Sequence, residues 1–130
     1  MAQEDYYFME VYRTIDDTFS YLRKKWNIQI IKGLFCDSKH FKDFLEQHPG
    51  LSSKVLSERL KELENEGILE KKIISSAPAQ TEYCLTEKGH RLDKIIFELF
   101  NFALDEVMKD EDPERREESK KNLKACLNLK

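Results

Sequence analysis

The sequence predicts a mainly α-helical domain with one small β-hairpin. Over most of the 130 residues, leucine, isoleucine and aromatic residues recur at steps of three and four. This period is typical of amphipathic helices. After Gly67 the period shortens to about two in the segments ILEKKIIS and TEYCLT. Strands place every second side chain on one face, so these two segments predict a pair of strands.

The first two helices are predicted from their apolar periods. A helix over residues 6–25 carries an aromatic face, which consists of Phe8, Tyr12, Ile15, Phe19 and Leu22. A second helix is expected from about Trp26, which we interpret as a core anchor. Its apolar side consists of Ile30, Ile31, Leu34 and Phe35, and the polar stretch CDSK ends it.

A short third helix is expected in the stretch KHFKDFLEQ. We expect Ser38 to cap it, because a serine side chain can accept from a free backbone N–H at a helix start. Pro49 disfavours helical geometry at His48, and Gly50 then allows a sharp turn.

The fourth helix, residues 51–66, is expected to have two different faces. Ser52 is the predicted N-cap, and Gly67 ends the helix in the left-handed conformation. The buried stripe is predicted to be Val55, Leu56, Leu60 and Leu63. The other face offers serine hydroxyls and lysine ammonium groups.

The hairpin, residues 68–85, is followed by one more long helix. The loop SAPAQ joins the two strands, and Thr86 is expected to cap the helix EKGHRLDKIIFELFNFALDEVMK. Apolar residues cover more than half of this helix, which is more than one core face requires.

The excess of apolar surface predicts a dimer interface, to which the aromatic first helix also contributes. The expected interface residues are Phe8, Tyr12, Phe19, Leu99, Phe100, Phe102, Leu104 and Met108. The alternative is that the tail, residues 110–130, folds back over this surface. Its apolar content is thin, so we expect a weak helix or a disordered segment.

Composition excludes several classes of protein. The net charge of -3 argues against wholesale coating of nucleic acid, although residues 21–94 carry +3 between an N-terminal segment of -4 and a C-terminal segment of -2. No apolar run approaches the roughly 20 residues of a membrane span. The amino terminus is acidic where a signal peptide is basic, so we expect a cytoplasmic protein without membrane contact. Catalytic triads, phosphate loops and HExxH are absent, which makes an enzyme the weakest hypothesis.

The cysteines and histidines show no ligand spacing. Cys36, Cys84 and Cys126 form neither a CxxC pair nor an even disulfide set, and we interpret them as small, fairly buried hydrophobes. The three histidines are scattered, so we expect no metal site and no cofactor.

The order of elements is that of a winged helix-turn-helix. The tight turn HPGLSS precedes a helix whose polar face is nearly clear of acids until Glu58. In such a domain this helix enters the major groove, where Lys54 and the serine hydroxyls can reach phosphates or base edges. We therefore predict a dimerisation helix over 1–25, a DNA-binding core over 26–88 and a second dimerisation helix over 89–109.

Three segments resemble the HxlR-type winged-helix transcriptional regulators in order and spacing. They are KKWNIQIIKGLF, HFKDFLEQHPGLSSKVLSERLKELENEGILEKKI and TEYCLTEKG, within residues 19–108. The motifs LKELENEGI and LTEKG also occur in MarR-like and PadR-like relatives, whereas Trp26 with HPGLSSKVLSERL is more specific. The resemblance implies a homodimeric transcription factor that binds promoter DNA, with the hairpin as its wing.

The chain departs from the family pattern at three positions. Arg13 stands where some members have a redox-sensing cysteine, which argues against thiol sensing by that route. His40 and Ala79 stand where the family often has arginine, so we expect neighbouring lysines to replace two DNA contacts. The predicted DNA-binding residues are Ser52, Ser53, Lys54, Ser57, Arg59, Lys61, Lys39, His40, Lys42, Lys71, Lys72, Ser76 and Gln80.

Each prediction has a plainer alternative. Ser52 could serve only as a cap, and the lysines could form only a solvated face. In that case the chain would be a winged helix that binds proteins and not DNA. Arg59 is as well placed to pair with Glu62 or Glu66 as with a phosphate. The aromatic first helix is also a candidate to line a pocket for a small-molecule effector.

Overall fold

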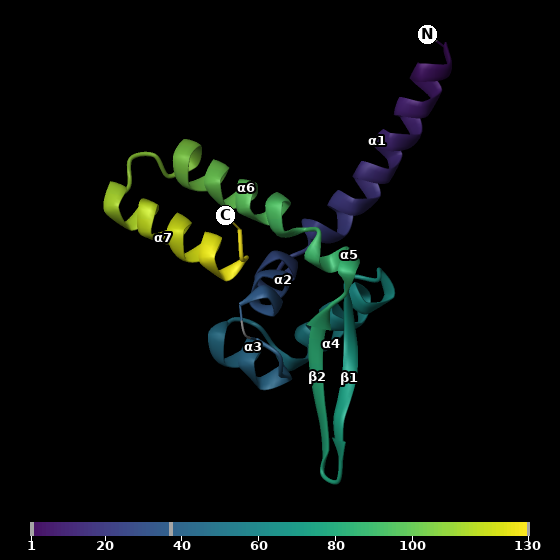
Figure 1. Ribbon diagram of the computed structural model, residues 1–130, viewed down its shortest axis with the longest axis vertical. Helices are drawn as coiled ribbons and strands as arrows, with labels where there is room; N and C mark the ends of the chain where they lie inside the picture. The colour runs from purple at the N-terminus through teal and green to yellow at the C-terminus, as the bar shows by residue number, and fades with distance from the viewer. Residues whose placement is uncertain (1, 37, 130) are drawn as a thin grey trace.

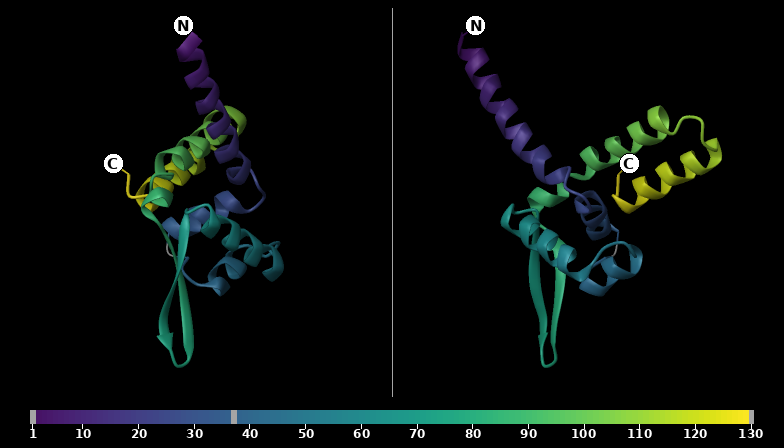
Figure 2. Two further views of the ribbon diagram at one scale, coloured as in Figure 1. Left: turned by 90° about the vertical axis from the view of Figure 1, so that its right-hand side faces the viewer. Right: turned by 180° about the vertical axis from the view of Figure 1, so that it is seen from behind.

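The computed structural model describes residues 2–36 and 38–129, and its elements follow the predicted order (Figure 1). Helix α1 stands away from the body, the hairpin extends in the opposite direction, and α6 and α7 form an antiparallel arm to one side (Figures 1 and 2). The helices and strands are α1 Ala2–Leu22, α2 Asn27–Phe35, α3 Phe41–Gln47, α4 Ser53–Asn65, β1 Leu69–Ser76, β2 Ala79–Leu85, α5 Glu87–His90, α6 Asp93–Phe102, the π-helix η1 Ala103–Val107 and α7 Pro113–Cys126.

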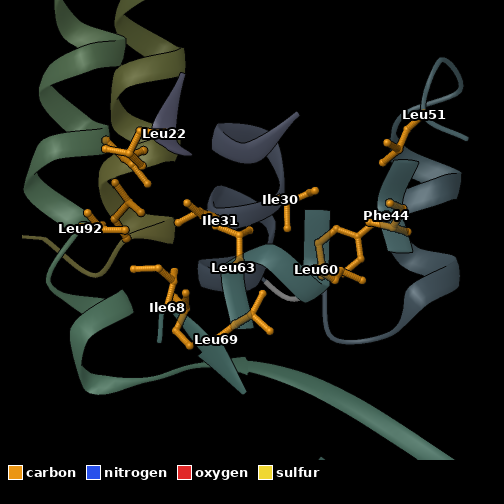
Figure 3. Close-up of a cluster of buried hydrophobic side chains, with 14 of the residues drawn as sticks. Leu22, Ile30, Ile31, Phe44, Leu51, Leu60, Leu63, Ile68, Leu69 and Leu92 are labelled. Atoms are coloured by element: carbon orange, nitrogen blue, oxygen red, sulfur yellow. The ribbon is translucent and has the colours of Figure 1, made fainter. Parts of the chain in front are cut away.

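The core lies between α2, α3, α4 and the base of the hairpin (Figure 3). The α4 residues Leu56, Leu60 and Leu63 are buried as predicted, whereas Val55 is only half-buried. They pack in one cluster with Ile30 and Ile31 of α2, Phe44 of α3, Ile68 just before β1, and Leu69, the first residue of β1. Full burial of each such side chain contributes about 1.5–3 kcal/mol, so this stripe fixes one face of α4 to the body.

Both ends of α4 are closed as the sequence predicts. The Ser52 Oγ accepts a hydrogen bond from the Val55 N–H at 3.1 Å. Gly67 has a φ of 76°, which is the left-handed conformation that favours glycine. The Ile68 N–H donates to the Leu63 carbonyl at 2.9 Å. This bond belongs to a Schellman motif, and it turns the chain directly from α4 into β1.

The third helix begins later than predicted. His40, not Ser38, is its N-cap, and the helix starts at Phe41. The Asp43 carboxylate accepts from the backbone N–H of His40 at 2.9 Å and of Lys39 at 3.2 Å. Ser38 is instead buried in the α2–α3 connection, so its predicted role as the cap is wrong.

The predicted long helix after Thr86 is divided. Thr86 is the N-cap, as expected, and its Oγ1 accepts from the Gly89 N–H at 3.0 Å. The helix α5 ends at His90, α6 starts at Asp93, and η1 follows as a π-helix. A Cβ on Gly89 would lie 2.1 Å from the Ile68 carbonyl oxygen. Close approach of α5 to β1 therefore requires glycine here.

The charged tail is helical, and it is covalently attached to the body. Pro113 and the Asp112 cap start α7, and Cys126 at its end forms a disulfide with Cys36 at the end of α2. The Cα atoms of the two cysteines are 5.2 Å apart, which is within the range of disulfides. The interpretation of these cysteines as unpaired hydrophobes is therefore wrong. Cys84 keeps its thiol and is half-buried.

Within residues 2–36 and 38–129, no helix combines the length and the apolar character that a bilayer span requires.

Candidate nucleic-acid interface

The outer face of α4 is polar and open to solvent. Ser52, Ser53, Lys54, Ser57 and Lys61 are all exposed, opposite the buried leucine stripe. The first turn of α4 leaves backbone N–H groups at its start, and a helix N-terminus favours anions such as phosphate. The Ser52 hydroxyl accepts the capping bond and still has its own proton to donate. A cap and an external contact are thus compatible in one side chain.

Some charged side chains of α4 form ion pairs with the rest of the chain, and others do not. Lys24, in the connection between α1 and α2, pairs with Glu62 at 2.9 Å and offsets the charge of this acid on the side of α4. Among the described residues, neither Lys54 nor Lys61 lies within ion-pair distance of a carboxylate. Glu58 and Glu64 are exposed acids of the same helix, each three residues from Lys61, whereas the first turn holds no acid. The start of α4 therefore presents mainly positive charge.

Arg59 does not join this face. Its Nε donates to the Lys25 carbonyl at 3.0 Å, and its Nη1 lies 3.6 Å from Glu62 Oε1. The side chain is only 18% exposed. Arg59 thus fastens α4 to the α1–α2 junction, and it makes the pair with Glu62 that the sequence analysis gave as the alternative to a phosphate contact.

The hairpin is tied to the start of α3. The Tyr83 N–H donates to the Lys39 carbonyl at 2.8 Å, and His40 Nδ1 lies 3.2 Å from the Thr81 carbonyl oxygen. His40 is half-buried by this contact, so it positions the wing as well as lying near the predicted interface. Lys39 and Lys42 are exposed beside it.

The two lysines of the wing do not act together. In the antiparallel register Lys71 is opposite Tyr83 and Lys72 is opposite Glu82, so the two side chains are on different faces of the hairpin. Lys72 pairs with Glu70 at 3.6 Å, which places it in an acidic environment. The Lys71 Nζ lies 6.0 Å from the centroid of the Tyr83 ring. Ser76 and Gln80 are exposed near the hairpin end, as predicted for contact residues.

Two residues that shape the site, Asp43 and Lys24, were not predicted from the sequence. The backbone N–H of His40 holds the pKa of the Asp43 carboxyl below its usual range, which keeps this acid ionised where it accepts from the N-cap of α3. An acid three residues after an N-cap is a known signal, and the wrong cap concealed it. Lys24 is separated from Glu62 by 38 residues, so no local sequence pattern predicts that they pair.

The proposed dimer surface is mostly open. Of the eight predicted residues, Phe8, Tyr12, Phe19, Leu99, Phe102 and Met108 are exposed apolar side chains, with Phe19 at 55% and Phe102 at 65%. Phe100 is instead half-buried against the core, and Leu104 is half-buried beside α7. The tail helix thus covers one side of α6 and leaves the other side exposed.

Comparison with known proteins matches this arrangement to one family. The HxlR-like helix-turn-helix family matches residues 21–111. The chain is 40% identical over 89 residues to the HTH-type transcriptional regulator YodB of Bacillus subtilis (strain 168), covering 68% of this chain and 80% of that protein. It is 42% identical over 82 residues to the uncharacterized HTH-type transcriptional regulator YvaP of the same organism, covering 63% and 76% respectively.

Solved structures agree with the sequence matches. The reduced form of YodB from B. subtilis aligns with a TM-score of 0.63 at 36% identity, over 72% of this chain and 91% of that chain. The quinone-bound form of YodB aligns with a TM-score of 0.61 at 38% identity, over 70% and 96%. These relatives are transcriptional regulators, as expected for a chain without catalytic motifs. The fold, the exposed helix α4 and the family match agree, and the chain belongs to the HxlR-like helix-turn-helix family of transcriptional regulators.

Proposed function

We propose that this chain is a sequence-specific transcriptional regulator that binds double-stranded DNA with α4 in the major groove. The observation that carries the proposal is the outer face of α4, where Lys54, Lys61 and three serines are exposed on a helix whose opposite side is buried. This geometry offers both phosphate contacts and short hydrogen-bonding groups for base edges. The regulators among its relatives support the same function.

We further propose that the hairpin lies along the DNA backbone beside the groove. The hydrogen bond from Tyr83 to the Lys39 carbonyl joins the wing to the start of α3, so Lys39, Lys42 and Lys71 would approach the duplex as one unit. Lys72 is a weaker candidate, because its charge is offset by Glu70.

Two copies of the chain would form the active regulator in the cytoplasm. The exposed aromatic face of α1 and the open side of α6 support a homodimer, since soluble monomers rarely expose contiguous apolar patches of this kind. A two-fold dimer would present two α4 helices to one side of DNA and recognise a palindrome.

The test is a selection of genomic fragments with the purified protein, followed by binding measurements at several salt concentrations. We expect a palindromic site with half-sites about one helical turn apart. The logarithm of affinity should fall by roughly 0.9 per logarithmic unit of salt for each phosphate contacted. Binding without a salt slope, or no enriched sequence, would favour the alternative of a protein-binding winged helix.

We also propose a small-molecule effector of the quinone class. The support is the similarity to YodB, which has a quinone-bound structure, together with the shallow apolar surface of Ile95, Leu99 and Phe102 on α6, which the proposed dimer would enclose. A quinone should change the affinity for the selected DNA fragment by several-fold. Unchanged DNA affinity at saturating quinone contradicts this part of the proposal and leaves DNA binding intact.

A further inference from the structure

The connection between α1 and α2, residues 23–26, contacts one side of α4. The Nε atom of Arg59 donates to the Lys25 carbonyl at 3.0 Å, although the two are 34 residues apart in the chain. Lys24 pairs with Glu62 at 2.9 Å, and Nη1 of Arg59 lies 3.6 Å from the other carboxylate oxygen of Glu62. Arg59 and Glu62 are neighbours on the helix surface, three residues apart. The connection therefore holds this turn of α4 by a backbone carbonyl and by an ion pair.

Trp26, the last residue of this connection, packs against the turn that precedes α4. The centroids of the Trp26 and His48 rings are 5.8 Å apart, and a Cβ on Gly50 would lie 3.4 Å from Trp26 Cη2. Trp26 has a φ of 81°, and a bulky residue adopts this left-handed conformation only where its surroundings hold it. The connection is thus fixed against the start of α4 as well as against its side.

The connection also holds the end of α1. Asn27, the first residue of α2, is fully buried, and its Nδ2 donates to the Tyr21 carbonyl at 2.6 Å. Leu22 is buried in the core, whereas residues 5–20 of α1 are largely exposed and project from the body (Figure 2). The direction of α1 relative to α4 therefore depends on residues 21–27.

We propose that residues 23–26 set the orientation of α4 for DNA binding, with Arg59 and Trp26 as positioning residues that do not touch the duplex. The inference rests on the proposed function, because it concerns how α4 reaches DNA. Without an anchor, α4 and the turn before it occupy several orientations, of which only some fit the groove. The apparent affinity then falls by the fraction of protein in the competent orientation. Since α1 is the proposed dimerisation helix, the same residues also orient α4 relative to the second copy of the chain.

The salt dependence of binding distinguishes a positioning residue from a residue that contacts a phosphate. A variant that has lost only an anchor still makes every phosphate contact once it is bound, so its salt slope stays that of wild type. A variant that has lost one phosphate contact has a slope smaller by about 0.9. Lys54→Ala, on the proposed docking face, is the reference for this second behaviour.

The first test measures affinity and salt slope for the selected DNA fragment with the full-length protein. Arg59→Ala should bind about tenfold more weakly with the wild-type slope, because only the competent fraction has changed. Arg59→Lys should also lose affinity several-fold, since lysine keeps the charge but not the planar donors that reach the Lys25 carbonyl and Glu62 together. Trp26→Phe should behave in the same way, because the smaller ring packs less closely on the turn. Arg23→Ala removes one positive charge from an exposed position of the same connection and should bind like wild type. A slope smaller by about 0.9 for Arg59→Ala, or wild-type affinity of either Arg59 variant, overturns the proposal.

The second test needs no DNA, because Trp26 is the single tryptophan of the chain and its fluorescence reports on the turn before α4. Acrylamide should quench this fluorescence more strongly in Arg59→Ala and Arg59→Lys than in wild type and Arg23→Ala. Circular dichroism checks that each variant is folded, and Arg59→Lys alone supports both measurements if Arg59→Ala does not fold. Equal quenching in all folded variants overturns the proposal. Failure of wild type to bind any selected fragment counts against the proposed function, while the quenching comparison still decides whether Arg59 holds the turn.

Discussion

Lys54 and Lys61 are the side chains on which the proposed interface depends most directly. Both are exposed on α4, and neither is paired with a carboxylate of the described residues. Nearby charges of the body are already engaged, with Lys24 on Glu62 and Arg59 on the Lys25 carbonyl. The two lysines thus keep their charge available for phosphate.

Lys54→Ala and Lys61→Ala should each lower DNA affinity by about tenfold, on the order of 1–2 kcal/mol, and reduce the salt slope by about one. The melting temperature should hardly change, because both side chains are exposed. Fluorescence anisotropy at several salt concentrations measures the first effect and thermal melting the second. Lys121→Ala, an exposed lysine of α7, is the matched control. Wild-type affinity of Lys54→Ala would show that α4 is not the docking helix.

Gly89 illustrates a residue whose importance is steric. An alanine Cβ there would lie 2.1 Å from the Ile68 carbonyl oxygen and 3.0 Å from Leu85 Cδ2. Gly89→Ala should therefore lower the free energy of unfolding by about 1–3 kcal/mol, as overpacking does in a dense core. At Gly50 the added Cβ would meet the Trp26 ring at 3.4 Å, an ordinary contact, so Gly50→Ala should cost much less. Equal urea midpoints for the two variants contradict this prediction.

At the scale of elements, α4 works because its two faces are separated. The leucine stripe is buried against α2 and α3, while the serines and lysines remain in solvent. The caps at Ser52 and Gly67 define where the helix starts and ends. Substitution of the buried leucines would destabilise the packing of α4 on the body. Substitution of the exposed serines and lysines would remove only the proposed contacts with DNA.

Leu60→Ala should cost about 2–5 kcal/mol of unfolding free energy, because it opens a cavity beside Phe44 and Ile30. Urea denaturation of the purified protein measures this loss. Glu64→Ala, an exposed position on the same helix, is the control and should stay within about 0.5 kcal/mol of wild type. A small loss at Leu60 would mean that the stripe is not the anchor of α4.

At the scale of the molecule, the main feature is the exposed apolar surface on α1 and α6. Helix α1 projects from the body (Figure 2). Only Tyr21 at its end packs against the core, and the other described aromatic residues of α1 are exposed, namely Tyr6, Tyr7, Phe8, Tyr12 and Phe19. The tail helix meets α6 on one side only and leaves Phe102 and Val107 exposed, at 65% and 73%. The tail therefore leaves this surface open, and it stays available for the proposed second copy of the chain.

Phe19→Glu should convert the proposed dimer into a monomer, because a charge in an apolar interface loses its hydration without gaining a partner. Sedimentation velocity would show a fall to the mass of one chain, and affinity for the palindrome should fall with it. Ile74→Glu, at an exposed apolar position on the wing, should leave the mass unchanged. A wild-type protein that sediments as a monomer contradicts the dimer directly.

Much of the fold was predictable because its determinants lie close together in the chain. The apolar periods of α1, α2 and α4, the caps at Ser52 and Thr86, and the left-handed Gly67 each depend on neighbours within about five residues. The same locality placed the serines and lysines of α4 on one outer face. Errors arose where two local signals competed, as for Ser38 and His40 at the start of α3.

The residues of this chain specify its periods, caps and turns before any long-range contact forms, and those features are enough to indicate a winged helix with a basic docking face. Folding in three dimensions then determines which groups meet across the chain. Glu62 meets Lys24 across 38 residues, His40 meets Thr81 across 41, and Cys36 meets Cys126 across 90. The sequence pattern does not predict such pairs, because the distance between the two residues depends on how whole elements pack. That packing turned Arg59 inward, neutralised Glu62 and joined α7 to the body.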